Sequence, residues 1–168
     1  MTELIQETAD DIQYLESISN ALDIALNEAD LAQIKEELMQ SGYIRRKHTK
    51  KKVKLTSKPM HYISSDGYDM YVGKNNLQNE ELTFSFANGN DWWFHAKGAP
   101  GSHVIVKSGG DELPDRTFEE AGRLAAYYSK NRGADKVEID YIQQKTCQEA
   151  ERGKAGIRCL LYKLFSGH

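Results

Sequence analysis

The spacing of the apolar residues changes near residue 60 and divides the chain into two structural classes. Before this point, apolar side chains recur every three, four or seven residues, which is the spacing of one face of an α-helix. These residues are Ile5, Ile12, Leu15, Leu22 and Leu26. After this point, apolar and polar residues alternate, as in a half-buried β-strand. The sequence therefore predicts an α+β protein, with a mainly antiparallel sheet and one amphipathic helix packed on it, preceded by a helical segment.

The helical front is predicted to contain two helices. We expect a first helix of about 25 residues, whose narrow apolar seam is typical of one arm of a coiled coil. An ordinary two-helix packing element has the same pattern, and Ile18 and Ile24 lie off the seam, so a second face is also partly covered. Asn27 or Asp30 supplies the N-cap of a second, shorter helix, which Gly42 ends.

Charge is distributed unevenly along the chain. Residues 1–44 contain ten acidic residues and one basic residue, whereas residues 45–58 contain eight basic residues and no acidic one. We therefore predict a helical arm at 1–44, a basic linker at 45–58 and a folded domain at 59–168. The linker attracts a polyanion where one is near, although many such runs are simply solvated. Its expected non-specific phosphate contacts are Arg45, Arg46, Lys47, Lys50, Lys51, Lys52 and Lys54.

The folded domain is predicted to consist of hairpin-connected strands and one helix. Asp66 and Gly67 lie between two alternating runs, which is a hairpin signal. Thr117 and Glu120 have the spacing of a capping box, and we expect them to open a helix that Gly133 closes. The expected strands are 61–63, 68–72, 82–86, 92–96, 103–107, 136–142 and 157–165.

The chain offers few residues for metal binding. His95 and His103 are eight residues apart, and Cys147 and Cys159 are twelve apart, whereas zinc ligands usually pair at shorter spacings. His48 stands alone in the basic linker. The sequence therefore predicts neither a metal site nor another cofactor.

Catalysis and export also lack a clear signal. Ser102 lies beside His103, but adjacency in sequence does not bring a nucleophile, a base and an orienting group together. A hydrolase or an RNA-modifying accessory that uses His95 and His103 stays open, but we expect no enzyme activity. The N-terminus lacks the basic start of a secretory signal, no apolar run is long enough to cross a membrane, and two cysteines make no disulfide framework. We therefore expect a cytoplasmic protein.

The stretch DWWFHAKGAPGSH, residues 91–103, is dense in aromatic and imidazole side chains. In a strand, Trp92 and Phe94 share one face while Trp93 and His95 share the other, and we expect the second pair to face outward. Exposed rings offer planes on which bases stack, and neighbouring lysines offer phosphate contacts. The amides that follow Gly73 either cap turns or bond sugars and phosphates.

Several motifs of the folded domain resemble the NFACT-R domain of the NEMF/RqcH ribosome quality-control family, called fibronectin-binding protein A-like in bacteria. They are Val72-Gly73-Lys74-Asn75-Asn76-x-x-Asn79, Asp91-Trp92-Trp93-Phe94-His95-Ala96, Pro100-Gly101-Ser102-His103-Val104, the helix Glu120–Lys130 and the strand Val137–Lys145. The resemblance covers residues 60–156, and residues 157–168 fit the family poorly. Residues 1–44 resemble the returning arm of the family's coiled coil, so we expect a C-terminal fragment.

The resemblance implies a role in ribosome-associated quality control. Proteins of this family bind obstructed large ribosomal subunits with peptidyl-tRNA and support template-free C-terminal tailing, mainly with alanine in bacteria, which marks the stalled chain for degradation. It implies that this domain binds tRNA and rRNA at the ribosome. Without its partner arm, the coiled-coil segment is expected to pair with a copy of itself. A fibronectin-binding surface adhesin module is the alternative that the bacterial name favours.

We expect the RNA-binding surface to combine three groups. These are polar residues after the second strand, the outward side chains of the aromatic stretch with its neighbours, and cations at the end of the helix. The residues are Lys74, Asn75, Asn76, Asn79, Trp93, His95, Lys97, Ser102, His103, Lys107, Lys130 and Arg132.

Overall fold

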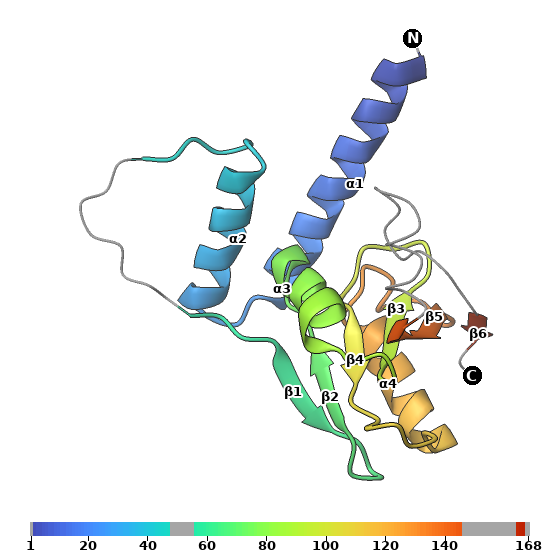
Figure 1. Cartoon of the computed structure of the whole chain (residues 1–168). Coiled ribbons are helices and arrows are strands. Elements are labelled where there is room, and N and C mark those ends of the chain that lie inside the picture. Colours follow the sequence, from blue (N-terminus) through green and yellow to red (C-terminus); the bar gives the residue numbers. More distant parts are fainter. Residues whose placement is uncertain (1, 48–55, 146–163, 167–168) are drawn as a thin grey trace.

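The computed structural model describes residues 2–47, 56–145 and 164–166, and it shows an α+β fold with a helical arm (Figure 1). Its elements are α1 (Thr2–Ile24), α2 (Glu28–Gln40), β1 (Met60–Ile63), β2 (Asp69–Val72), α3 (Asn76–Glu81), the π-helix η1 (Leu82–Phe86), β3 (Trp92–Ala96), β4 (Val104–Val106), α4 (Asp115–Tyr127), β5 (Glu138–Gln143) and β6 (Leu164–Ser166). The predicted fold class is confirmed.

The strands form one antiparallel sheet in the order β1-β2-β4-β3-β5-β6. The strand predicted at 157–165 overlaps β6, and the rest of that prediction lies outside the described residues. No helix within the described ranges is both long and apolar enough to cross a membrane. The helix α4 covers one face of the sheet, and α3 with η1 lies on the other.

The main core lies between the sheet and α4. Val72, Phe94, Val104 and Ile139 come from four different strands, alternate with residues of the opposite face, and are at most 3% exposed. The small side chain of Ala121, which is fully buried, lets α4 approach them closely. Because each large apolar side chain contributes about 1.5–3 kcal/mol on burial, this layer fixes α4 on the sheet.

A second core layer lies on the opposite face, under η1. Leu82 and Ala87 pack over Trp93 and Ile105 there. The strand predicted at 82–86 is wrong, because this segment continues α3 as a π-helix, with the Ala87 N–H donating to the Leu82 carbonyl at 2.9 Å. Its alternating apolar residues had the period of a strand, but tertiary packing over Trp93 decided the conformation.

The capping box predicted for α4 is also wrong. The helix begins two residues before Thr117 and ends at Tyr127, well before Gly133. Thr117 is fully buried, and its hydroxyl donates to Asp66 Oδ2 at 2.8 Å. Glu120 accepts the N–H of the serine that precedes Asp66, at 2.8 Å. Both side chains therefore tie α4 to the turn between β1 and β2 instead of capping the helix.

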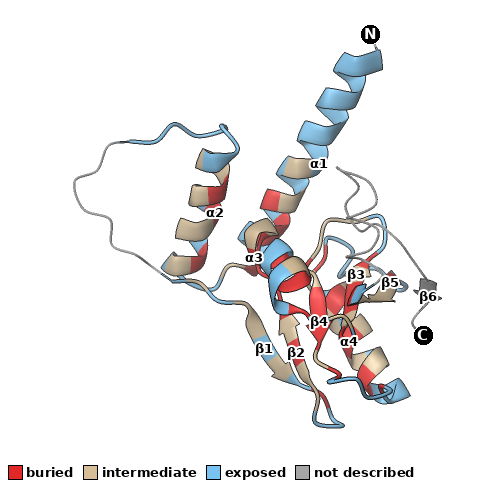
Figure 2. Cartoon of the chain, viewed as in Figure 1, coloured by how far each residue is buried: buried red, intermediate tan, exposed pale blue. Residues whose placement is uncertain are grey.

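The helical arm projects away from the sheet, and the N-terminal part of α1 is exposed (Figure 2). The predicted seam of α1 lies at the surface, whereas Ile18, Ala21 and Ile24, on a different face, are buried. The predicted ends of α2 are confirmed. The Asn27 side chain accepts a backbone N–H at its start, and Gly42 follows its end with φ at 80°.

Candidate functional site

Residues 73–79 pack against the helical arm. Lys74 is 8% exposed, and its Nζ donates to Asp30 Oδ1 of α2 at 2.6 Å. A buried ion pair needs further hydrogen bonds to offset its lost hydration. Asp30 accepts them from the Ser57 hydroxyl at 2.7 Å and from the Leu26 N–H at 3.0 Å. We name the contact between residues 73–79 and the two arm helices the arm joint.

The surroundings of Asp30 keep its carboxyl ionised. Burial is the largest single influence and raises its pKa, but hydrogen bonds from Lys74, Leu26 and Ser57, with the charge of Lys74, together outweigh it. The pKa of Asp30 therefore lies below the ordinary value for aspartate. At neutral pH the arm joint holds a carboxylate against an ammonium group.

Asn76 links the folded domain to both arm helices. Its amide donates to Ser17 Oγ of α1 at 2.8 Å and to Glu37 Oε1 of α2 at 2.7 Å. Burial raises the pKa of Glu37 above its ordinary value, although the hydrogen bond from Asn76 acts in the opposite direction. The neighbouring Asn75 caps α3 and donates to Gln33 of α2 at 2.7 Å. The amides after Gly73 therefore serve as a cap and as links to the arm.

Asn79 connects the motif around Gly73 with the motif that contains Gly101 and His103. Its Oδ1 accepts the His103 N–H at 3.0 Å, and its Nδ2 donates to the Gly101 carbonyl at 3.4 Å. A Cβ on Gly73 would lie 2.0 Å from Asn79 Oδ1, and one on Gly101 would lie 2.8 Å from the Cβ of Ser129. Both glycines are thus required by the close approach of neighbouring groups.

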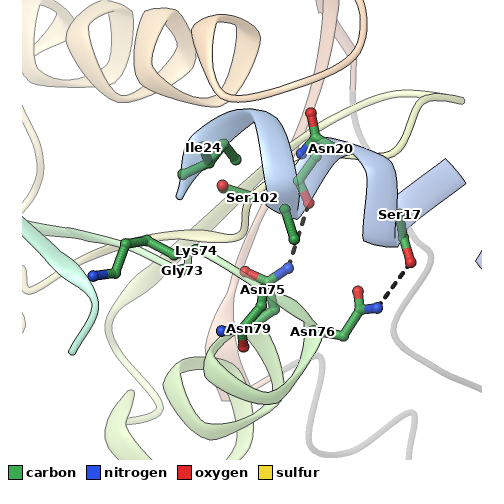
Figure 3. A pocket seen from close by; sticks show the side chains of 11 residues that line it. Ser17, Asn20, Ile24, Gly73, Lys74, Asn75, Asn76, Asn79 and Ser102 are labelled. Atoms are coloured by element: carbon green, nitrogen blue, oxygen red, sulfur yellow. Dashed lines mark hydrogen bonds between the residues drawn. The ribbon is translucent and has the colours of Figure 1, made fainter. Parts of the chain in front are cut away.

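A small cavity lies inside the arm joint, between α1 and the segments around Asn76 and Ser102 (Figure 3). Its volume of about 10 Å³ is roughly the space of one water molecule. Ser102 lines this cavity and is 1% exposed, and its hydroxyl has no hydrogen-bond partner among the described residues. Because its volume is that of about one water molecule, the cavity is too small to receive a nucleotide.

The cations after α4 also contact the arm. Lys130 Nζ lies 2.8 Å from Asp23 Oδ2 and donates to the Ser19 hydroxyl at 2.8 Å, and Arg132 Nη2 lies 3.3 Å from the same carboxylate. The hydrogen bond from Lys130 is the main cause that lowers the pKa of Asp23. These groups are partly exposed, so water screens the pairs. The pairs still reduce the charge that Lys130 and Arg132 offer to a polyanion.

Trp93 lies in the second core layer and is 2% exposed, so the stacking plane expected at this residue is wrong. The strand β3 is covered on both faces, with Phe94 beneath α4 and Trp93 beneath η1. Trp92 faces α4, as predicted, and its ring centroid lies 4.8 Å from that of Phe118. The alternation of β3 correctly divided the two pairs between opposite faces, but the expectation that Trp93 and His95 face outward is wrong, because η1 covers the second face.

His95 and His103 meet beside Trp93. Their ring centroids are 5.4 Å apart, and each lies within 5.6 Å of the indole centroid. His103 Nδ1 shares a hydrogen bond of 2.7 Å with the Thr83 hydroxyl. Burial lowers the pKa of His95 to about 4, against a smaller opposite effect of its hydrogen bond with the backbone of Gly101. His95 is therefore neutral at pH 7 and offers no positive charge to a phosphate.

The low pKa of His95 predicts a loss of stability in mild acid. Unfolded His95 would bind a proton below its ordinary pKa of 6.5, whereas the folded residue stays neutral to about pH 4, so falling pH favours the unfolded state in this window. We expect the free energy of unfolding of His95→Gln to fall by about 2 kcal/mol less than that of the wild type between pH 7 and pH 5. Urea unfolding at both pH values measures this difference. If His95→Gln keeps the wild-type pH dependence, the prediction is refuted.

The remaining predicted cations lie at the surface or outside the described residues. Lys97 lies 3.4 Å from Glu138, and Arg46 lies 2.9 Å from Glu36, both in exposed ion pairs. Lys107 is only partly exposed, and its Nζ donates to the buried carboxylate of Asp91 at 2.6 Å. Arg45 and Lys47 are exposed, whereas Lys50, Lys51, Lys52, Lys54, His48, Cys147 and Cys159 lie outside the described residues.

In the part of the chain that is described, no cluster of three His, Cys, Asp or Glu side chains has the arrangement of a metal site.

Sequence reasoning missed the arm side of the joint. Asp30, Gln33 and Glu37 follow a spacing of three and four residues, so they share one face of α2. This polar face could have indicated a hydrogen-bonded contact with another part of the chain. Whether the residues of the arm joint also contact RNA stays a prediction.

Two family models together match most of the chain. Residues 58–155 match the NFACT protein RNA binding domain, and residues 1–57 match the NFACT N-terminal and middle domains. The change of family model therefore falls at the junction between the basic linker and β1.

Relatives from two bacteria support the same assignment. The chain is 45% identical over 157 residues to the Rqc2 homolog RqcH of Streptococcus pneumoniae, covering 93% of this chain and 28% of that protein. It is 35% identical over 159 residues to the Rqc2 homolog RqcH of Bacillus subtilis, covering 92% of this chain and 27% of that protein. The chain thus spans little more than a quarter of the length of these relatives.

A solved structure shares the fold. The C-terminal part of the fibronectin/fibrinogen-binding protein from Streptococcus suis has a TM-score of 0.78 and 43% sequence identity, covering 86% of this chain and 57% of that chain. The match to the RNA-binding family model extends over more than half of the chain. This chain therefore belongs to the family of NFACT proteins, and residues 58–155 are its NFACT RNA-binding domain.

Proposed function

We propose that this chain is the RNA-binding part of a ribosome-associated quality-control factor. The match of residues 58–155 to the NFACT RNA-binding domain carries the proposal, and the RqcH relatives, named as Rqc2 homologues, support it. In the whole protein, this part would bind tRNA and rRNA on obstructed large ribosomal subunits that hold peptidyl-tRNA. It would thereby support template-free alanine tailing of the stalled chain for degradation. Such a protein works in the cytoplasm, at the ribosome.

The arm joint gives the helical arm a structural role in this function. The buried Lys74–Asp30 pair and the bonds from Asn76 attach both arm helices, and Asn20 Nδ2 of α1 donates to the Tyr128 carbonyl at 3.2 Å. The direction of α1 is thus fixed relative to the RNA-binding domain. Its exposed apolar seam remains available for another coiled-coil arm or for a second copy of this chain, which sedimentation at several protein concentrations would detect.

We further propose that this domain binds RNA without catalysing a reaction on it. Neutral His95 packs against buried Trp93, and His103 Nδ1 bonds the Thr83 hydroxyl, so both imidazoles have contacts within the fold. A hydrolase that used both imidazoles would lose its turnover in the double variant His95→Ala/His103→Ala. A binding module would show no turnover in either protein.

The direct test of RNA binding is a titration at several salt concentrations. The affinity of the chain for tRNA or rRNA should fall as salt rises, because bound lysines release the counterions of the phosphates. The triple variant Lys50→Gln/Lys51→Gln/Lys52→Gln should weaken binding. It should also reduce the slope of log affinity against log salt by about 2, at about 0.7 for each phosphate contact to a single strand.

A charge-matched variant provides the control for this titration. Arg116→Gln/Arg123→Gln/Lys136→Gln removes the same charge from exposed residues of the folded domain. This control variant should keep most of the wild-type slope of log affinity against log salt. If the wild-type chain shows no binding at low salt, the proposed RNA contact is wrong. If both triple variants lose the same slope, the basic linker has no special part in it.

Fibronectin or fibrinogen binding is the second candidate function. The solved structure from Streptococcus suis is named for this activity and shares 43% identity with this chain. Surface plasmon resonance with fibronectin, fibrinogen and tRNA on parallel surfaces distinguishes the two functions. The quality-control proposal expects binding to tRNA alone.

A further inference from the structure

Among the residues that the structure describes, no helix lies over one half of the sheet face that carries η1. Met60 and Tyr62 of β1 pack toward the core under α4. The alternating residues His61 and Ile63, and Tyr71 opposite His61 in β2, lie on the other face. The helix η1 packs over β3 and β4, and the side chain of His61 stays 45% exposed. Ile63 is 67% exposed.

Three rings form a continuous row from this uncovered half to the end of η1, and the middle one, Tyr71, also packs against the second core layer. The ring centroids of His61 and Tyr71 are 4.6 Å apart, with an angle of 12° between the planes. The Phe86 ring meets Tyr71 edge-on, with centroids 4.8 Å apart. Phe86 is the last residue of η1 and is 40% exposed. We name His61, Tyr71 and Phe86 the aromatic strip.

Polar contacts hold the two ends of the aromatic strip in place. His61 Nε2 lies 2.7 Å from Asp69 Oδ1. Lys107 Nζ lies 4.5 Å from the centroid of the Phe86 ring, donates to the Phe86 carbonyl at 3.1 Å, and bonds Asp91 Oδ2 at 2.6 Å. A partner would therefore meet rings that are already ordered, which reduces the entropy lost on binding.

The composition of the aromatic strip and its place in the chain favour RNA as the partner. Rows of exposed rings on a sheet are surfaces on which unpaired bases stack. The strand β1 directly follows the basic linker, which has eight basic residues and no acidic one, and Lys58 is exposed two residues before β1. A polyanion attracted to the linker thus arrives beside His61. A protein strand added at the edge of β1 would use backbone hydrogen bonds, which need no rings.

We propose that the aromatic strip stacks unpaired bases of the RNA that this domain binds, an inference that rests on the proposed function. His61 and Phe86 provide the accessible ring faces. Tyr71, partly buried between them, sets their spacing, and Lys107 positions Phe86. Paired bases in a duplex have no free faces, so the aromatic strip selects single-stranded segments.

The test uses the 168-residue chain and the double variant His61→Ala/Phe86→Leu. The probes are a single strand of about ten uridines that contains one 2-aminopurine, and a duplex of the same length. We expect the variant to lose about 30-fold or more in affinity for the single strand, because each of the two lost stacks weakens binding by about fivefold or more. The quenching of 2-aminopurine, which reports stacking, should fall as well, while affinity for the duplex should stay unchanged.

Tyr127→Leu is the matched control. Tyr127 is 60% exposed on α4, which covers the other face of the sheet, so its loss should leave both affinities at the wild-type value. Thermal melting followed by circular dichroism checks folding. If the double variant unfolds, His61→Ala alone, at an exposed imidazole, should still reduce quenching.

The outcomes separate this inference from the proposed function. If the wild-type chain binds the single strand and the aromatic-strip variants show the same affinity and the same quenching, the inference is wrong while RNA binding stands. That result is expected if the aromatic strip contacts a protein. Failure of the wild-type chain to bind either probe would overturn both.

Discussion

Asp30→Ala should reduce the free energy of unfolding by about 3–5 kcal/mol, because it leaves a buried lysine without its counter-ion. The side chains of Asp30 and Lys74 are 2% and 9% exposed, so water cannot replace the lost carboxylate. The Ser57 hydroxyl and the Leu26 N–H lose their acceptor in the same substitution. Urea unfolding at pH 7 measures the loss, and hydrogen exchange should show α2 opening before the sheet.

Asp23→Ala is the control for this experiment. Asp23 also accepts from two cations, but its side chain is 42% exposed, so water compensates for the lost pairs. Its effect should be much smaller than that of Asp30→Ala. The double variant Asp30→Leu/Lys74→Met should recover most of the lost stability, since apolar side chains of similar volume often replace a buried pair without cost. Equal losses for Asp23→Ala and Asp30→Ala would contradict a buried pair in the arm joint.

Gly73→Ala should destabilise the chain by between about 2 and 5 kcal/mol. The new Cβ would lie 2.0 Å from Asn79 Oδ1 and 3.0 Å from the Asn79 backbone nitrogen, so the side chain of Asn79 and the backbone of α3 must move. Displacing Asn79 also removes the acceptor of the His103 N–H and the donor to the Gly101 carbonyl. The loss combines overpacking with unpaired polar groups, and thermal and urea unfolding measure it.

Gly122→Ala provides the matched control, because it adds the same methyl group where there is room. A Cβ there would lie 3.8 Å from Ile139 Cγ1, which is ordinary contact. Within α4, alanine should stabilise the helix by up to about 1 kcal/mol relative to glycine. The two substitutions should therefore have opposite signs. A neutral Gly73→Ala would mean that Asn79 does not bridge the two motifs as described.

The general architecture could be predicted from the sequence because it depends on periodicity. The change of apolar spacing near residue 60 placed the helical arm and the sheet, and the faces of β3 followed from alternation. The same reasoning from periodicity gave a wrong prediction for residues 82–86. Leu82, Phe84 and Phe86 alternate as in a strand, but only Leu82 is buried, and the segment follows directly from α3. A five-residue pattern is too short to outweigh packing over Trp93.

The position of the candidate site could be predicted only in part. The motifs around Gly73 and Ser102 do come together in space, through Asn79. Their burial could not be predicted, because it depends on Asp30 and Glu37, about 40 residues earlier in the chain. Polar side chains are usually exposed, so the sequence favoured a surface at Lys74 and Asn76. The helical arm covers that surface in the folded chain.

The aromatic strip escaped sequence reasoning for a related reason. His61, Tyr71 and Phe86 come from three elements, and a single stretch of sequence contains only one of them. The stretch around Trp93 has more aromatic residues close together in the sequence, but Trp93 is buried. An antiparallel register of β1 and β2 would have paired His61 with Tyr71, but the place of Phe86 depended on η1.

The most direct test of RNA binding by this domain is ultraviolet crosslinking of the wild-type chain to RNA, followed by identification of the crosslinked peptides by mass spectrometry. We expect crosslinks in the basic linker and at the aromatic strip, at residues 45–61, Tyr71 and Phe86. Buried Trp93 and the outer face of α4 should be free of them. No crosslinks, or crosslinks confined to α1 and α4, would contradict the account.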